Sequence, residues 1–179
     1  MPKMQGVNFL ERLQRQFGKN ITGANLEALD PWIEVAPAGL PEVCRYLKDH
    51  PDFCFNYLNC ITAVDYFLAD PKKAAKAGWE PHLELVYHLS STQNKNSLVL
   101  KVMLPRWKDD EEAKLPAVPS VADIWRTADW HEREVYDLSG VHFTDHPDLR
   151  RILCPDDWEG YPLRKDYEMP LEYHGIRGR

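Results

Sequence analysis

The residues with the greatest capacity for chemistry are concentrated in one segment, WHEREVYDLSGVHFTDHPDLRRILCPDDWEGYPLRKDY, which spans residues 130–167. Acidic and basic side chains are interleaved along it, and buried charges are tolerated in proteins when they are paired and hydrogen-bonded. Arg133 and Asp137 stand four residues apart, so they could pair on a helix, where Glu134 would share nearly the same face as Asp137. We interpret the segment as one that many paired charges hold in place.

Catalysis by the same segment is the alternative. The candidates for acid-base work are carboxylates and histidines, namely Glu132, Glu134, Asp137, His142 and His146. Each carboxylate has a basic residue nearby in the sequence, which accounts for it as an ion-pair partner. A metal site could be formed by His142, Asp145 and His146, but their spacing suits a helix and Pro147 disfavours one. Paired charges are therefore the favoured interpretation.

Two pairs of basic residues, Arg150–Arg151 and Arg164–Lys165, could bind a phosphate or a nucleotide. Arginine suits bidentate anions, but the same geometry suits carboxylates on a neighbouring protein. Residues 141–179 hold eight acidic and six basic residues, which favours the carboxylate interpretation. The sequence has no GxGxxG or GxxxxGK loop, and its four cysteines form no CxxC pair. We therefore expect no site for NADH, flavin, ATP or a metal in this chain, and reduced structural thiols.

The overall composition narrows the class of protein. A length of 179 residues suits one folded unit, and a formal net charge of -6 disfavours binding to the phosphate backbone of nucleic acids. No apolar run approaches the ~18 residues that a membrane-spanning helix needs, so direct membrane insertion is not expected. The first residues lack the apolar core of a secretory signal, which favours a cytoplasmic location.

The elements that must position the charged segment are indicated by hydrophobic periodicity. The expected helices cover residues 8–17, 40–50, 121–125 with Ser120 as cap, and 127–138 ended by Gly140. The expected strands cover residues 32–36, 82–91 and 97–105, and residues 53–67 suit a strand or a strand pair. The last two strands are joined by a short polar connector and predict an antiparallel hairpin, whereas the acidic stretch 108–114 predicts a solvated loop.

These elements predict an α+β fold, with N-terminal helices on a mostly antiparallel sheet, followed by a helical segment and an extended C-terminal arm. We place the α+β domain at residues 1–140 and the arm at residues 141–179, where periodicity fades. A long irregular arm cannot easily form a core of its own. We therefore expect it to pack on partner subunits.

The charged segment also resembles the signature of the C-type subunit family of respiratory complex I, the NADH-quinone oxidoreductase of bacteria. The matching residues are Glu132-Arg133-Glu134, Asp137-Leu138, Gly140, Phe143, His146 to Leu153, Pro155, Asp157-Trp158, Gly160 and Pro162 to Tyr167. A looser resemblance extends upstream through residues 55–58, 98–104 and 119–121. Ser139 and Glu168 depart from the pattern, but neither is part of the charged framework.

The resemblance implies a cofactor-free structural subunit in the hydrophilic arm of a proton-translocating NADH:quinone oxidoreductase, on the cytoplasmic side of the bacterial inner membrane. It implies contact with the large quinone-site (D-type) subunit and with iron-sulfur subunits, while FMN, iron-sulfur clusters and quinone belong to other subunits. It implies no catalytic, cofactor-binding or metal-binding residue here. The expected interface residues are Glu132, Arg133, Glu134, Asp137, His146, Asp148, Arg150, Arg151, Asp157, Trp158, Arg164, Lys165 and Asp166.

Two alternatives stay open at this point. The chain could be a stand-alone hydrolase or binding protein that uses the charged segment as a pocket. It could also be the equivalent subunit of a photosynthetic NDH complex or a membrane-bound hydrogenase.

Overall fold

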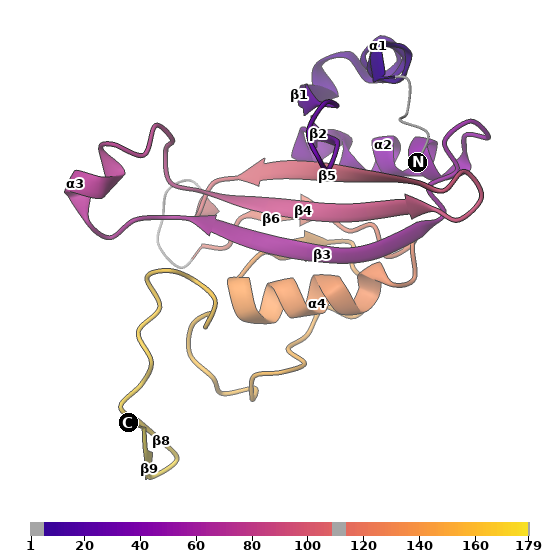
Figure 1. The fold of residues 1–179 in the computed structure, drawn as a ribbon. Coiled ribbons are helices and arrows are strands. Elements are labelled where there is room, and N and C mark those ends of the chain that lie inside the picture. The colour runs from indigo at the N-terminus through magenta and orange to yellow at the C-terminus, as the bar shows by residue number, and fades with distance from the viewer. Residues whose placement is uncertain (1–5, 109–113, 179) are drawn as a thin grey trace.

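A five-stranded sheet forms the centre of the computed structural model, which describes residues 6–108 and 114–178 (Figure 1). The strand order is β1-β2-β5-β4-β3. All neighbours are antiparallel except β2 and β5, which are parallel, so the predicted mostly antiparallel sheet is confirmed. The strands are β1 (Ile21–Asn25), β2 (Trp32–Val35), β3 (Tyr57–Tyr66), β4 (His82–Ser91) and β5 (Asn96–Leu104).

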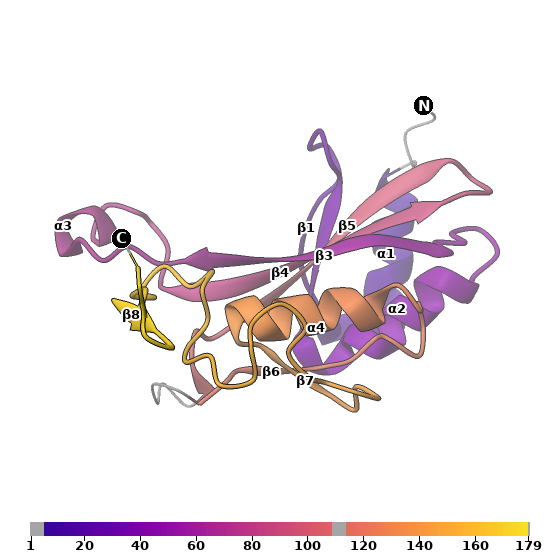
Figure 2. The ribbon, with the colours of Figure 1, turned by 90° about the horizontal axis from the view of Figure 1, so that it is seen from below.

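One face of the sheet carries the core. In β4 the side chains of Leu83, Leu85, Tyr87 and Leu89 are fully buried, as alternation along a strand with one covered face requires. The helices α2 (Leu40–Asp49) and α4 (Ala128–Ser139) lie on the same side of the sheet (Figure 2). α1 (Gly6–Phe17) packs beside α2 and adds Leu13 to this core. A short helix, α3 (Pro71–Ala74), lies in the connection from β3 to β4.

The remaining regular elements are short. Two 3-10 helices, η1 (Gly18–Asn20) and η2 (Pro37–Gly39), flank the first hairpin. β6 (Ala117–Pro119) pairs in parallel with β7 (His142–Thr144), and β8 (Glu172–Tyr173) pairs with β9 (Ile176–Arg177) near the C-terminus. No α-helix follows α4 among the described residues, and the chain between β7 and β8 is irregular, as the sequence predicted.

Most predicted elements are confirmed, but two are wrong in part. The predicted helix over residues 121–125 is a turn, because the Ser120 hydroxyl accepts the N–H of Ala122 in a local loop instead of capping a helix. The predicted strand over residues 53–67 begins only at Tyr57, because the N–H groups of residues 53–55 turn back to the carbonyls of Leu47 and His50 at the end of α2. Most of the predicted acidic loop lies outside the described residues.

The predicted arm begins inside the fold. Val141 and Phe143 are both buried in the hydrophobic core, and β7 pairs with β6. The chain after β7 then runs along α4 before it ends in the β8–β9 hairpin, which projects away from the sheet (Figure 1). Packing of the arm on partner subunits stays a prediction. Within the described part of the chain, no helix is long and apolar enough to cross a membrane.

Candidate functional site

Helix α4 carries an unusual set of buried charges. Glu132, Arg133 and Asp137 are all buried, because they lie on the side of the helix that is covered by the sheet and by the chain after β7. The helix ends at Gly140, whose backbone is left-handed with φ of 65°. A side chain at this position would meet the ring of Tyr161, so only glycine allows the arm to approach so closely.

Asp137 organises the first part of the arm. Its Oδ2 accepts three successive backbone N–H groups, from Ile152 at 3.0 Å, Leu153 at 2.6 Å and Cys154 at 2.9 Å. Its Oδ1 accepts Nη1 of Arg151 at 3.0 Å. Burial alone would raise the pKa of Asp137, but these backbone N–H groups outweigh burial and hold the pKa below its ordinary value. The carboxylate is therefore charged and ties the arm to α4.

The predicted pairing of Arg133 with Asp137 is wrong. Arg133 instead binds Asp129, one turn earlier on α4, at 2.8 Å and Asp148 at 3.2 Å. Asp137 is not available because the arm fills its hydrogen-bonding capacity. Glu134 stands three residues before Asp137 on α4, as predicted, but it is exposed whereas Asp137 is fully buried.

Arg164 fixes the second part of the arm. Its guanidinium is buried and donates to three backbone carbonyls, those of Ser139 at 2.6 Å, Gly140 at 3.1 Å and Arg106 at 2.9 Å. Two of these carbonyls lie at the C-terminal end of α4, where the helix dipole favours a cation. Burial lowers the pKa of Arg164. The side chain thus satisfies carbonyls that the end of the helix leaves without partners.

A third contact joins the arm to the sheet, and no sequence motif predicted it. Arg106, just after β5, binds Asp65 of β3 through two hydrogen bonds of 2.8 and 2.9 Å, and binds Asp166 at 2.7 Å. Asp65 also accepts the backbone N–H of Lys165. Burial alone would lower the pKa of Arg106, but the bonds to Asp65 and Asp166 raise it above its ordinary value. The only sequence signal for this contact is that a charged residue stands near the end of each of the two strands, Asp65 in β3 and Arg106 after β5.

Among the buried charges of the segment, Glu132 has no lysine or arginine as its partner. Its carboxyl group is fully buried and accepts Ser120 Oγ at 2.5 Å and the N–H of Val121 at 2.8 Å. The only basic group that the described residues place near it is the ring of His146, at 3.9 Å. Burial raises its pKa to about 7. The expectation that a basic neighbour accounts for every carboxylate is therefore wrong at this position.

His146 lies beside Glu132 in the same buried cluster. Its Nδ1 accepts the N–H of Asp148 at 3.0 Å, so the ring proton sits on Nε2, which faces the Asp129 carbonyl at 3.1 Å. Neither Glu132 nor the His146 ring is exposed, so no substrate reaches this carboxyl-imidazole pair. His142 and Asp145 are exposed, and the described residues contain no group of three or more His, Cys, Asp or Glu that could hold a metal ion.

The thirteen residues expected at a subunit interface fall into three groups. Five side chains are buried within the chain and have intramolecular partners: Glu132, Arg133, Asp137, His146 and Arg164. Arg151 and Trp158 are half-buried. The other six are exposed: Glu134, Asp148, Arg150, Asp157, Lys165 and Asp166. The buried ones shape the surface of the arm, and a direct contact with a partner stays a prediction for the exposed ones.

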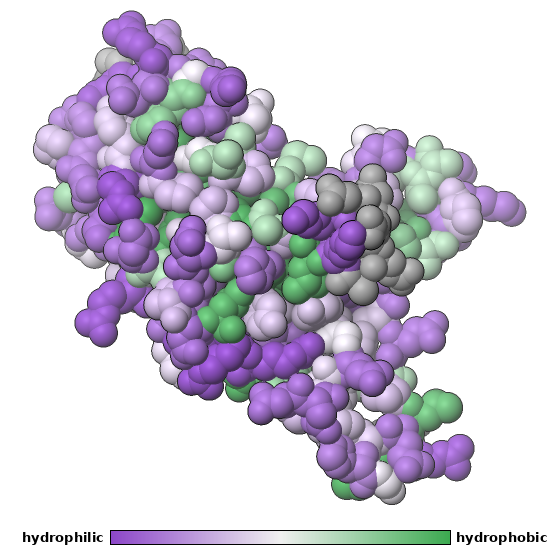
Figure 3. Space-filling model, turned by 180° about the vertical axis from the view of Figure 1, so that it is seen from behind, coloured by the Kyte–Doolittle hydropathy of each residue, from purple (hydrophilic) through white to green (hydrophobic). Residues whose placement is uncertain are grey.

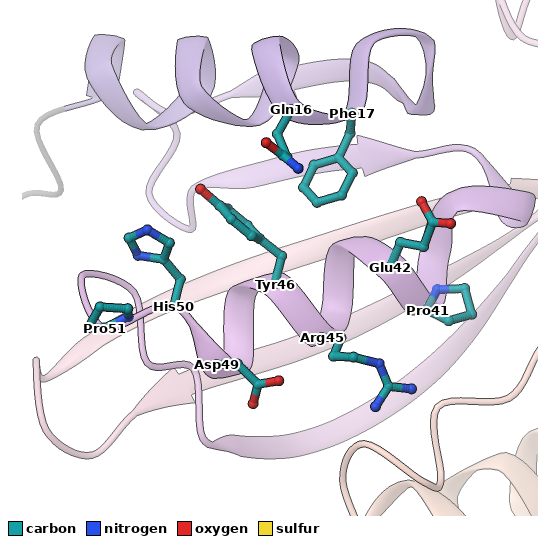
Figure 4. A pocket seen from close by; sticks show the side chains of 9 residues that line it. All are labelled: Gln16, Phe17, Pro41, Glu42, Arg45, Tyr46, Asp49, His50 and Pro51. Carbon is teal, nitrogen blue, oxygen red and sulfur yellow. The ribbon is translucent and has the colours of Figure 1, made fainter.

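A separate groove of about 660 Å³ lies between α1 and α2, where no expected interface residue is found (Figure 4). The rings of Phe17 and Tyr46 meet edge to face at 5.3 Å along it. The charged Arg45 extends from the far side of α2 and binds Asp123 at 2.8 Å. The groove therefore combines the aromatic surface of Phe17 and Tyr46 with polar side chains such as Glu42 and Asp49.

The fold is similar to that of several solved structures, two of which come with clear overlap. One belongs to the membrane-bound sulfane sulfur reductase, an archaeal respiratory membrane complex, with a TM-score of 0.67 and 26% identity over 90% of this chain and 85% of that one. The other is the trypsin-resistant fragment of Nqo5, with a TM-score of 0.58 and 28% identity over 78% of this chain and 98% of that one. The fold thus defines an α+β domain of the class that occurs in a respiratory complex.

The family itself follows from the sequence. The family model described as "Respiratory-chain NADH dehydrogenase, 30 Kd subunit" matches residues 33–173, and the chain belongs to this family. A relative in Chlorobium phaeobacteroides, the C-type subunit of NADH-quinone oxidoreductase, is 39% identical over 174 residues, which cover 97% of this chain and 95% of that protein. The resemblance predicted from residues 130–167 is confirmed.

Proposed function

We propose that this chain is a structural, cofactor-free subunit of a proton-translocating NADH:quinone oxidoreductase. Its role is to position the quinone-site subunit and the neighbouring iron-sulfur subunits in the hydrophilic arm of the complex. The observation that carries the proposal is the way in which Asp137, Arg164 and Arg106 use their charges within the chain, to hold an irregular arm against α4 and the sheet. A chain that stabilises an irregular surface in this way presents a shape for a partner to recognise.

The chemistry of the charged segment supports a structural role for it. Three of its carboxylates, those of Asp137, Asp148 and Asp166, bind arginine, which disfavours them as general bases at neutral pH. The carboxyl group with a pKa near neutrality, Glu132, is buried away from any substrate. A stand-alone hydrolase would need such a group in an accessible pocket.

The arm is the part of the surface that we assign to the partners. Its exposed apolar side chains include Leu163, Met169, Leu171 and Ile176, and the last three lie in or near the C-terminal hairpin, which projects from the body of the molecule at the lower right of Figure 3. Exposed apolar groups that cluster beside polar ones are typical of protein interfaces. We assign them to the large quinone-site subunit, on the cytoplasmic side of the bacterial inner membrane.

The equivalent subunit of a related respiratory complex is the second candidate. It is favoured by the likeness to the subunit of the sulfane sulfur reductase complex, whose TM-score exceeds that of the Nqo5 fragment. The two candidates share a structural role and differ in the subunits that surround the chain.

Affinity purification of the full-length tagged chain from native membranes in mild detergent tests the proposal. We expect co-purification of quinone-site, iron-sulfur and flavin subunits, together with NADH-dependent quinone reduction by the purified material. The same procedure on an untagged strain is the control. Recovery of the chain alone with hydrolytic activity would overturn the proposal, and partners without an NADH-oxidising subunit would favour the second candidate.

A further inference from the structure

A cavity of about 360 Å³ lies between the turn at Trp158 and the C-terminal hairpin. Aromatic rings line it, from Trp158, Tyr167 and Tyr173, and the rings of Trp158 and Tyr173 are 5.1 Å apart. Asp157 holds the hairpin in place, because it accepts the Tyr173 hydroxyl at 2.7 Å and Nε2 of His174 at 2.6 Å. The cavity is therefore built by contacts between two segments of the arm.

The rim of this cavity is acidic. Glu159, Glu168 and Glu172 line it, and all three are exposed. None of the three forms an ion pair with a cationic group in the described part of the chain, whereas most carboxylates around α4 do. Aromatic faces and unpaired carboxylates both attract cations, the first through the ring quadrupole and the second through charge.

We propose that this cavity binds a basic side chain, arginine above all, from a protein neighbour of the chain. A planar guanidinium stacks on aromatic rings and binds carboxylates through several donors at once, which an ammonium group does less well. The inference rests on the proposed function, because the neighbour is another subunit of the same complex. It adds the chemistry by which the C-terminal hairpin recognises that subunit.

Two observations favour a protein over a small free cation. Met169, Leu171 and Ile176 are 66%, 77% and 75% exposed beside the cavity, and a small cation would leave them in water. The buried Trp158 Nε1 and Tyr167 hydroxyl have no hydrogen-bond partner within the described chain. Buried polar groups are normally paired, so we expect these two groups to gain partners when the subunit is assembled. A protein surface supplies both apolar cover and hydrogen-bonding groups.

The first test uses the assembled complex. A tagged full-length chain with Glu159→Gln, Glu168→Gln and Glu172→Gln is compared with a matched variant that carries Glu11→Gln, Glu27→Gln and Glu80→Gln, three exposed glutamates elsewhere. We expect the cavity variant to recover roughly tenfold fewer partner subunits than wild type, with little change in the matched variant. The difference should shrink as NaCl is raised, because salt screens exposed charges.

The second test uses the isolated full-length chain and a defined probe. The indole N–H signal of Trp158, assigned with a Trp158→Phe variant, is followed by NMR during titration with acetyl-Gly-Arg-Gly-amide and with the same peptide containing citrulline, which lacks the charge. We expect the arginine peptide to shift the signal and the citrulline peptide to leave it unchanged. Equal shifts by both peptides, or by tetramethylammonium chloride as strongly as by the arginine peptide, would overturn the inference.

The outcomes separate this inference from the proposed function. Normal assembly of the cavity variant, while wild type still recovers its partners, overturns the inference alone. Failure of wild type to recover any respiratory subunit overturns the proposed function.

Discussion

Asp137 on α4 and Arg151 in the arm are joined twice, because Arg151 Nη1 donates to the Asp137 carboxylate at 3.0 Å and to its backbone carbonyl at 3.3 Å. Arg151 also donates to the carbonyl of Gly160 at 3.0 Å. One side chain thus connects the helix to two turns of the arm. The arm has no regular backbone ladder here, so such contacts replace secondary structure.

Replacement of Asp137 by Asn should destabilise the chain by about 2–4 kcal/mol at pH 7, because three N–H groups and an arginine lose a charged acceptor. The pKa of Asp137 is held below its ordinary value of 3.8, so its contribution is present above that pH and is lost as pH falls through the folded-state pKa. Urea unfolding at pH 7 and at pH 3 measures this, and the gap between wild type and variant should narrow at pH 3. An unchanged gap would contradict an ionic role.

Arg150 and Arg151 are neighbours with different environments, and charge reversal should separate them. Arg151→Glu should destabilise the isolated chain by about 3–5 kcal/mol, since it places a second carboxylate beside the buried Asp137. Arg150→Glu should change stability by less than about 0.5 kcal/mol, because Arg150 is exposed and its ion pair with Asp148 is exposed too. Thermal unfolding of the isolated chain measures stability, and recovery of partner subunits measures assembly. We expect Arg150→Glu to lower the recovery of partner subunits without lowering stability. Equal losses of thermal stability in the two variants would refute the distinction.

Replacement of Glu132 by Gln should alter how stability depends on pH. Burial raises the pKa of Glu132 from its ordinary 4.5 to about 7, so the folded state binds more protons than the unfolded state between these values. Wild type should therefore lose stability relative to the Gln variant as pH rises from 4.5 to 7, by on the order of 3 kcal/mol. Chemical denaturation at pH 5, 6 and 7.5 measures the difference. A gap that does not change with pH would show that Glu132 titrates normally.

Gly140 is expected to tolerate no side chain. Alanine there adopts a left-handed backbone and displaces the ring of Tyr161, at a combined cost of about 2–3 kcal/mol. Gly78 is the matched control, because it is also left-handed with φ of 71° but has open space around it. Gly78→Ala should cost only about 1 kcal/mol. Equal losses for the two variants in urea unfolding would mean that packing against Tyr161 contributes nothing.

Amide hydrogen exchange should divide the arm into two parts in the free chain. The backbone N–H groups of Leu163, Arg164 and Lys165 are hydrogen-bonded to α4, to the arm itself and to Asp65, so we expect them to exchange slowly. Residues 168–178 meet the rest of the chain mainly through exposed side-chain contacts, those of Tyr173 and His174 with Asp157, so their backbone N–H groups should exchange quickly until the partner subunit binds. Slow exchange of the whole arm in the free chain would assign the hairpin to the fold of this subunit.

The central β4–β5 hairpin is predictable because its hydrophobic periodicity is strong. β1 and the pairing of β2 with β5 are not, because their local sequence signals are weak or absent. The strands β4 and β5 alternate apolar and polar residues and were placed almost to the residue. β1 was missed because its sequence, ITGAN, contains residues with low β-propensity and no alternation. The parallel pairing of β2 with β5 was not predictable, because nothing local connects residues 32–34 with residues 99–101.

The same contrast holds for the charged segment. Its composition predicted paired charges, and the family resemblance predicted its importance. Which charges pair depends on tertiary contacts, so Arg133 forms ion pairs with Asp129 and Asp148 and not with Asp137. Arg106 and Asp65 stood in no motif at all, although they anchor the end of the segment.

The bond between Asp65 and the backbone of Lys165 joins positions 100 residues apart, and Arg164 reaches back to Arg106 across 58 residues. During synthesis Arg164 leaves the ribosome after α4, so the carbonyls at the end of α4 lack this donor until then. A polypeptide released before residue 164 keeps that defect permanently. Only a copy that includes Arg164 therefore offers other subunits this finished surface.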